Sequence, residues 1–261
     1  SGLMQYGCAA PFSPEVVGGQ VIWLSKTVNG SGEVLTVSGF TPEPVSNFGT
    51  ENAFSGYVLD DAVGDTYEEK GHLFYILTFQ QSNVTWVFDS STNYWHQRGT
   101  WITEQGEFSA WYALFHAFAF GQNRFLSINT ASVYNASTDL YTDVEEREIR
   151  RVRRGPALTQ ENKRVFISSF ELDVEVGLGA TTGQGVDPQV MMRYSGDGGK
   201  TWSSEEYRSA GPLGEYSTRV RWNRCGMARR KVFEVAVSDP IPWRILNAYI
   251  ELQPSADIGQ R

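Results

Sequence analysis

The sequence predicts an all-β protein: a partial β-propeller with blades of about fifty residues, followed by a β-sandwich-like C-terminal region. Glycine-led apolar segments recur in the first half, and alternating strands replace them in the second. Aromatic residues make up 13% of the chain, which also holds 26 Gly. This composition is typical of β-proteins. The expected domains are residues 1–145, the propeller blades, and residues 146–261, an antiparallel β region.

The repeat begins with glycine. Segments GQVIWLS, GHLFYILTF and GQNRFLSI start at Gly19, Gly71 and Gly121. Each has a polar residue and then an alternating apolar run, the pattern of a strand. Short strands repeated at this period indicate propeller blades, which need neighbours to bury their faces. About three blades are expected, against roughly four to eight in a closed propeller. Either later strands complete the ring, or the chain is part of a longer propeller.

A second marker recurs within the repeat. The segments VFDSSTNYW (Val87–Trp95) and VYNASTDLY (Val133–Tyr141) align without gaps. Both predict a strand, a polar turn and another strand. Asp89 and Asn135 can bond the backbone just ahead of them and hold the turn.

A short helix is expected between the first two repeats. Ser46 or Asn47 can cap it, and Phe48, Phe54 and Tyr57 supply its apolar side chains.

The segment GTWITEQGEFSAWYALFHAFAF is unusually apolar. Core packing is the favoured interpretation of its aromatic residues. Exposure for contact with other subunits is the alternative for Trp101, Trp111, Tyr112 and Phe115.

Charge is unevenly distributed. The net charge is −8, but residues 1–145 hold four Lys or Arg against fifteen Asp or Glu, whereas residues 146–261 hold eighteen against fifteen. The asymmetry indicates two regions with different neighbours. So acidic a chain is a poor candidate for wrapping nucleic acid with its whole surface. No run of eighteen apolar residues occurs, so no membrane partner is expected.

Alternation dominates the C-terminal region. Five segments place apolar residues on one face and polar residues on the other, with Gly or Pro turns between them. They are Val165–Gly177, Gln189–Ser195, Tyr216–Gly226, Lys231–Asp239 and Ile245–Gln253. A pair of packed sheets is the prediction; one large final blade is the alternative.

One recognisable motif lies between two of these strands. SGDGGKTW fits the pattern Ser-x-Asp-x-Gly-x-Thr-Trp, the Asp box of sialidases and other β-propellers. Asp197 can accept backbone N–H bonds, while Gly198 and Gly199 permit positive φ. A structural turn is the predicted role. The motif residues are Ser195, Asp197, Gly199, Thr201 and Trp202.

Catalysis is not expected. A sialidase needs three arginines, a tyrosine backed by a glutamate, and an acid/base carboxylate. Tyr207 and Tyr216 have glutamates nearby in sequence (Glu205, Glu206 and Glu215), and nothing more supports an active site. A carbohydrate-binding or sialidase-like β-propeller remains the alternative.

No cofactor or metal is expected either. The histidines His72, His96 and His116 are scattered, so no zinc site can be argued. The two cysteines, Cys8 and Cys225, are expected to be buried free thiols.

An arginine run, REIRRVRR, joins the two regions. It predicts a twisted edge strand or linker. One interpretation is a solvated edge that blocks strand-to-strand aggregation; the other is a contact with an acidic surface or packaged DNA. Under the second, charge reversal at Arg151 and Arg153 weakens assembly or DNA retention. The candidate contact residues are Arg147, Arg150, Arg151, Arg153 and Arg154.

The C-terminus resembles a known family. RVRWNRCGMARRKVFEVAVSDPIPWRILNAYIELQ (Arg219–Gln253) is similar to the ending of the packaged-DNA stabilisation proteins of short-tailed phages, also called tail accessory factors. The shared pattern is Arg-Val-x-Trp, a basic cluster, an alternating strand, and a last strand ending Ile-x-Leu. RYSGDGGKTWS and GHLFYILTF resemble the family further upstream. The likeness covers most of the chain and is most specific over its last forty residues.

The resemblance implies a virion structural protein of the phage tail, made in the bacterial cytoplasm. Such proteins form a homo-oligomeric ring of six copies under the portal vertex. They lie between the portal adaptor and the tail needle, help retain the packaged DNA and present surface to tailspike proteins. The family is longer than this chain, which resembles its C-terminal half. It has no catalytic residues to transfer.

Overall fold

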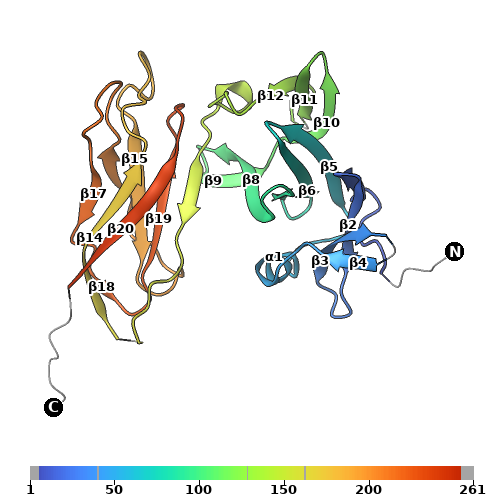
Figure 1. Cartoon of the computed structure of the whole chain (residues 1–261), viewed down its shortest axis with the longest axis horizontal. Helices are drawn as coiled ribbons and strands as arrows, with labels where there is room; N and C mark the ends of the chain where they lie inside the picture. Colours follow the sequence, from blue (N-terminus) through green and yellow to red (C-terminus); the bar gives the residue numbers. More distant parts are fainter. Residues whose placement is uncertain (1–5, 40, 128, 162, 254–261) are drawn as a thin grey trace. The chain divides into compact units, whose positions relative to one another are not determined.

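The computed structural model describes residues 6–39, 41–127, 129–161 and 163–253. Strands dominate this part of the chain, as predicted (Figure 1). The chain divides into two compact units, Ser1–Leu140 and Tyr141–Arg261. The sequence placed the boundary between residues 145 and 146. Here the two are called unit 1 and unit 2.

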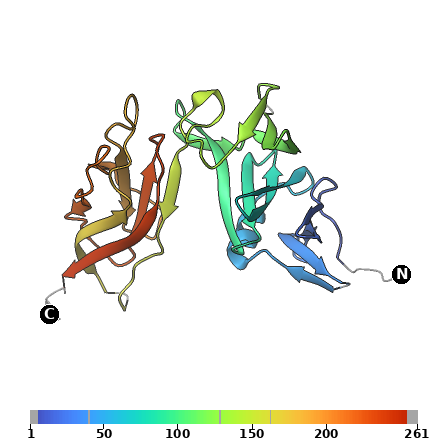
Figure 2. The ribbon, with the colours of Figure 1, turned by 45° about the horizontal axis from the view of Figure 1, so that its top comes forward.

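Unit 1 contains three antiparallel sheets in chain order (Figure 2). The first consists of β1 (Glu15–Val17), β2 (Gln20–Lys26), β3 (Gly32–Ser38) and β4 (Thr41–Pro44). The second consists of β5 (Ala62–Glu69), β6 (His72–Phe79), β7 (Val84–Asp89), β8 (Tyr94–Ile102) and β9 (Glu107–Ala110). The third consists of β10 (Ala113–Ala119), β11 (Gln122–Ser127) and β12 (Val133–Ala136). Because β5 contacts both β1 and β10, the first strands of successive sheets adjoin, as in a partial propeller.

The three glycine markers have one common geometry. Each lies in a two-residue turn between the first two strands of its sheet, with Val17 opposite Gln20, Glu69 opposite His72 and Ala119 opposite Gln122. Such hairpins favour positive φ at both central residues, which glycine adopts without strain. Both central residues have positive φ in all three turns: Gly18 and Gly19, Lys70 and Gly71, Phe120 and Gly121. The repeat is therefore a copied hairpin.

The second repeated marker, Val87–Trp95 and Val133–Tyr141, forms strand, turn and strand only in its first copy. Asp89 accepts hydrogen bonds from Ser91 N (3.0 Å) and Thr92 Oγ1 (2.8 Å), and β8 follows. Asn135 lies inside β12, and the next turn uses Ser137, whose Oγ accepts from Asp139 N at 3.2 Å. No strand pairs with β12 after that turn in the described chain, so the predicted second strand was wrong there. The sheet ends with its third strand.

The predicted helix is α1 (Phe48–Phe54). Asn47 is its N-cap, accepting from Thr50 N at 3.1 Å, while Thr50 Oγ1 accepts from Asn47 N at 2.9 Å. Phe54 is fully buried and packs against Phe79 with ring centroids 5.1 Å apart. The helix thereby covers the core that the first two sheets share.

Unit 2 is a β-sandwich. One sheet has the order β13 (Arg151–Arg154), β19 (Val232–Val237), β15 (Gln189–Ser195) and β16 (Glu206–Ser209). In the other, β14 (Val165–Val174) is flanked by β20 (Ile245–Gln253) on one side and by β17 (Val220–Asn223) and β18 (Met227–Ala228) on the other. All five predicted strands are present. The short strands β16 and β18 were not predicted.

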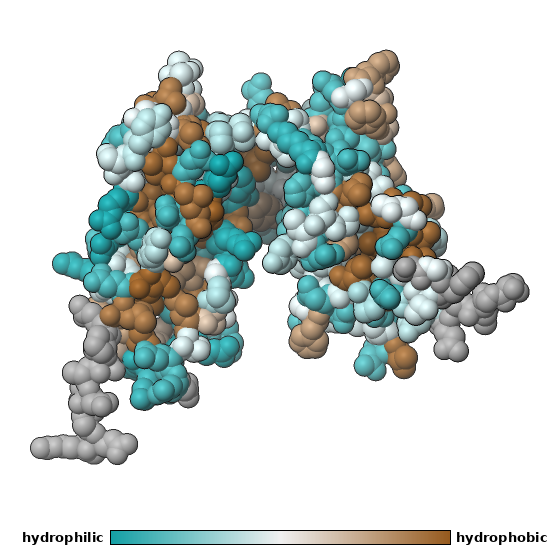
Figure 3. Space-filling view, viewed as in Figure 1, coloured by the Kyte–Doolittle hydropathy of each residue, from teal (hydrophilic) through white to brown (hydrophobic). Residues whose placement is uncertain are grey.

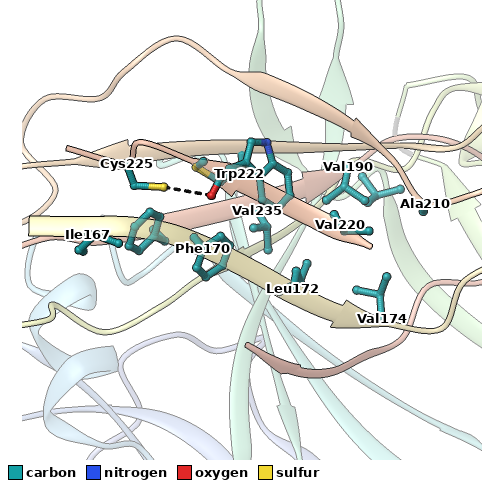
Figure 4. Packing of buried hydrophobic residues seen from close by; sticks show 13 residues of the cluster. Ile167, Phe170, Leu172, Val174, Val190, Ala210, Val220, Trp222, Cys225 and Val235 are labelled. Carbon is teal, nitrogen blue, oxygen red and sulfur yellow. Dashed lines mark hydrogen bonds between the residues drawn. The ribbon is translucent and has the colours of Figure 1, made fainter. Parts of the chain in front are cut away.

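Aromatic stacking joins the two sheets (Figure 4). Phe170 of β14 stacks on Phe233 of β19, with ring centroids 4.5 Å apart and an interplanar angle of 6°. Trp222 lies against Phe170 and donates from Nε1 to Glu206 O at 3.1 Å. Cys225 is a free, buried thiol in this core. Cys8 is also free but exposed, so its predicted burial was wrong.

Candidate functional site

The Asp box closes a tight turn after β15. The Asp197 carboxylate accepts from Ser195 Oγ (2.6 Å), Lys200 N (2.8 Å), Thr201 N (3.0 Å) and Thr201 Oγ1 (2.7 Å). These bonds, led by the Ser195 hydroxyl, lower the pKa of Asp197 below its usual value. Gly199 N donates to Ser195 Oγ at 2.8 Å. The motif residues therefore bond mainly to one another.

The motif tryptophan packs against arginines. The guanidinium carbons of Arg154 and Arg193 lie 4.8 and 4.9 Å from the ring centroid of Trp202. Both arginines also pair with Glu234, which lies between them in the sheet and is 3% exposed. In register, Glu234 stands opposite Arg154 on one side and Arg193 on the other. The Asp box and the arginine run thus meet in one cluster.

Most of the arginine run is engaged within unit 2. Arg147 pairs with Glu145 at 3.3 Å, Arg150 pairs with Glu205, and Arg154 pairs with Glu234. Arg151 donates to the carbonyls of Ile241 (2.6 Å) and Asp239. Among the described residues Arg153 has no side-chain partner. Four of the five arginines thus have partners within the chain, and their contact with an outside partner stays a prediction.

A groove opens between β13 and the start of β20. Its volume is about 390 Å³, and its lining residues are Arg151, Val152, Arg153, Trp243 and Ile245. Register explains the arginines: Arg151 stands opposite Val237 and Arg153 opposite Val235, and both valines belong to the core. The two side chains therefore share the inner face of β13. Two cations beside an indole suit an anionic group with apolar surface.

The tyrosines considered for catalysis lie elsewhere. Tyr207, on edge strand β16, is 53% exposed, and its hydroxyl donates to Glu205 Oε2 at 3.4 Å. Glu205 is also the partner of Arg150. Tyr216 is 74% exposed. Neither tyrosine lines the groove that contains Arg151 and Arg153.

The histidines are less scattered than their spacing indicated. His72 and His96 both pack on Phe74, with ring centroids 5.8 and 6.4 Å apart, and His116 packs on Tyr67 at 5.8 Å. Tyr67 and Phe74 stack on each other at 4.9 Å. Across the described residues no group of His, Cys, Asp and Glu is arranged to hold a metal ion. The three rings form one aromatic cluster between the second and third sheets.

Some exposed arginines were not singled out as contact candidates. Arg224, Arg229 and Arg230 lie near one another around β18. They are spaced apart in the sequence, whereas residues 147–154 contain five arginines, so the sequence drew attention only to the denser run. Within the described chain, no helix has the length and apolarity that spanning a bilayer requires.

Comparison with known proteins gives one family. Residues 150–253 match the family model described as "Bacteriophage P22 Gp10, beta-sandwich". The matched region runs from the residue before β13 to the last residue of β20. This part of the chain is therefore similar to a phage protein, as the resemblance implied. No curated protein matches the sequence.

Two solved structures are similar at low identity. One is an exo-β-1,3-galactanase from Phanerochaete chrysosporium with galactose, at 11% identity and a TM-score of 0.26, covering 88% of this chain and 65% of that one. The other is a family 43 arabinoxylan arabinofuranohydrolase from Bacillus subtilis with cellotetraose, at 12% identity and a TM-score of 0.22, covering 89% and 53%. The chain spans less than two thirds of either structure. At these TM-scores the likeness carries no conclusion about activity.

Proposed function

We propose that this protein is a non-enzymatic structural component of a phage tail. The match of residues 150–253 to the P22 Gp10 β-sandwich family is the observation that carries the proposal. In this role the chain joins a ring of six copies between the portal adaptor and the tail needle. The ring contacts the tailspike proteins, helps close the channel and retains the packaged DNA.

Exposed apolar surface supports an assembly role. On the third sheet of unit 1, Phe115, Leu126 and Val133 form a cross-strand row, and each is at least 39% exposed. Phe118 is exposed on the other face of β10, and Phe120 is exposed in the turn that follows. Subunit interfaces are enriched in such aromatic side chains, so this sheet is the proposed subunit contact of unit 1.

The candidate catalytic side chains and the Asp-box residues of unit 2 bind mainly to one another, which favours a structural role over catalysis. Tyr207, Glu205 and Arg150 form a surface chain of contacts beside an edge strand. The Asp box is occupied by its own hydrogen bonds, and Trp202 is covered by two arginines. These residues stabilise loops of the sandwich and leave no assembled set of acid, base and nucleophile among themselves.

Particles made without this protein test the proposal. Phage particles from a host that cannot translate the gene should package DNA and then lose it, and nuclease-resistant DNA per capsid measures the loss. Supplying the full-length protein should restore retention. Particles that lack the protein and still keep their DNA would contradict the role. Binding to a glycan array would favour the carbohydrate-binding alternative.

A variant and a matched control test the proposed subunit contact on the third sheet. Phe115→Ser removes an exposed aromatic residue from the cross-strand row, whereas Val28→Ser removes an exposed apolar residue from the hairpin between β2 and β3. Incorporation of the full-length variant into purified tails should fall for Phe115→Ser alone. Equal incorporation of the two variants would reject the third sheet as the contact.

A further inference from the structure

One end of the sandwich concentrates unpaired cations. It is the end that carries β18, where the chain enters β14 and leaves β15 (Figure 1). The exposed cations there, called here the basic end, are Arg164, Lys200, Arg224, Arg229 and Arg230. None of the five forms an ion pair within the described chain. Hydrophilic side chains form the tip of the unit at this end (Figure 3).

Backbone pairing brings these cations together from separate loops. Val165 pairs with Ala228, so Arg164 and Arg229, the residues just beyond this pair, lie at the same end of β14 and β18. Arg230 forms a parallel bridge with Asp197, and Gly198 N donates to Arg230 O at 3.2 Å. The turn that contains Lys200 is therefore fixed against the strand segment that contains Arg230.

Arg224 lies further along the same side of β14, in the loop that leads from β17 to β18. Its backbone N–H donates to Ser168 O at 2.7 Å, three residues into that strand. Arg224 also has a positive φ of 60°, which marks a sharp change of chain direction directly after β17. The basic end is thus assembled from the entry to β14, the Asp-box turn and the segment 224–230 between β17 and β19.

Acidic neighbours offset only part of the charge of the basic end. Asp197 is committed to the turn by its four donors, and Glu161 pairs with Lys163 at 3.1 Å. Arg164 and Arg229 flank the last pair of β14 and β18, so two like charges lie at one end of these strands. This arrangement therefore favours binding of an external anion.

We propose that the basic end binds the phosphate backbone of double-stranded DNA. Four of its five cations are arginines, whose planar guanidinium suits phosphate oxygens in bidentate contact. In the loops that build it, Met227 is the exposed large apolar side chain. Interfaces with nucleic acid are polar and positive, whereas the centre of a protein interface is apolar and aromatic. The composition of this surface matches the former.

In this proposal the Asp box holds part of the basic end in place. Its hydrogen bonds shape the turn that presents Lys200 beside Arg230. It acts as a positioning element and makes no phosphate contact itself, since a carboxylate would repel one. The inference goes beyond the proposed ring assembly, because phosphate binding needs only the surface of one chain.

Fluorescence anisotropy with a labelled 20-base-pair duplex tests the inference on the whole chain. The double variant Arg229→Gln/Arg230→Gln should lower affinity by about tenfold or more, and the slope of log K against log salt should fall by about 0.9 for each lost phosphate contact. The matched control, Arg219→Gln/Arg244→Gln, removes the same charge from arginines paired with Glu171 and Glu175. It should bind nearly as the parent does.

Three outcomes would overturn the proposal: no binding of the parent chain to the duplex in low salt, equal weakening by the two double variants, or equally tight binding to poly-L-glutamate. The last would identify an acidic protein surface as the partner. If the Arg229/Arg230 variant does not fold, Lys200→Gln changes one exposed side chain and should still weaken binding severalfold. A variant that joins tails normally but has lost duplex affinity leaves the proposed function intact.

Discussion

The guanidinium of Arg154 donates two hydrogen bonds to the same carboxylate oxygen of Glu234, from Nε at 2.9 Å and from Nη2 at 2.6 Å. Arg193 binds the other oxygen at 2.6 Å from the strand on the opposite side. Trp202 lies against both guanidinium groups. Three strands and the Asp-box turn are thereby joined through one buried carboxylate.

Glu234→Gln should lower the free energy of unfolding by about 1–3 kcal/mol, because two arginines lose the charge that they share. Glu171→Gln is the control. Its partner Arg219 is mostly exposed, so the loss should stay below about 1 kcal/mol. Urea titration followed by tryptophan fluorescence gives both values. Equal losses would show that the Glu234 pairs behave as surface pairs.

Asp197→Asn should remove a pH-dependent contribution to stability. Hydrogen bonds from Ser195 and Thr201 lower the pKa of Asp197 in the folded chain. The carboxylate therefore stabilises the fold above the unfolded-state pKa, about 4, and this contribution is lost as pH falls through the lower, folded-state value. The difference in Tm between parent and variant should be largest near neutral pH and shrink below about pH 4. A difference that stays constant with pH would contradict the assignment.

Lys231 should produce a dependence of the same sign at alkaline pH. It is 3% exposed, donates to Cys225 O and lies over the ring of Tyr194. Burial lowers its pKa from 10.5 to about 8. Between these values the unfolded chain binds more protons than the folded chain, so stability rises with pH.

The variant Lys231→Met isolates this effect. Relative to the variant, the parent should gain up to about 3 kcal/mol of unfolding free energy between pH 8 and 10.5, as measured by urea titration at each pH. Below pH 8 the difference should be flat. A parent that does not gain on the variant above pH 8 would place the lysine charge in a better solvated site.

Single substitutions of Arg151 and Arg153 should affect the stability of the fold differently. Arg151→Gln breaks bonds to two backbone carbonyls and should cost about 1–2 kcal/mol of unfolding free energy. Arg153→Gln should change it by less than about 0.5 kcal/mol, since no side-chain partner is lost. Reversing both charges at once would therefore confuse lost assembly with lost stability. Similar destabilisation by the two single variants would disprove the distinction.

The strands of the sandwich, the short helix and the hairpin repeat could be predicted from local residue patterns. Each depends on local chemistry: Asn47 caps its own helix, and the glycines at 19, 71 and 121 meet the φ requirement of their own turns. Alternation of period two shows which residues share a face of one strand. The Asp box is equally local, because its donors lie within six residues of its acceptors.

The order of the strands in each sheet could not be predicted in this way, and the roles of the charged residues depend on that order. Arg154 is 80 residues from Glu234, and Arg151 is 90 residues from Ile241, so no local spacing revealed that these arginines are engaged. The basic end likewise depends on the pairing of β14 with β18. The physical reason is that period-two alternation defines the faces of a strand, while register and sheet order follow from packing between distant segments.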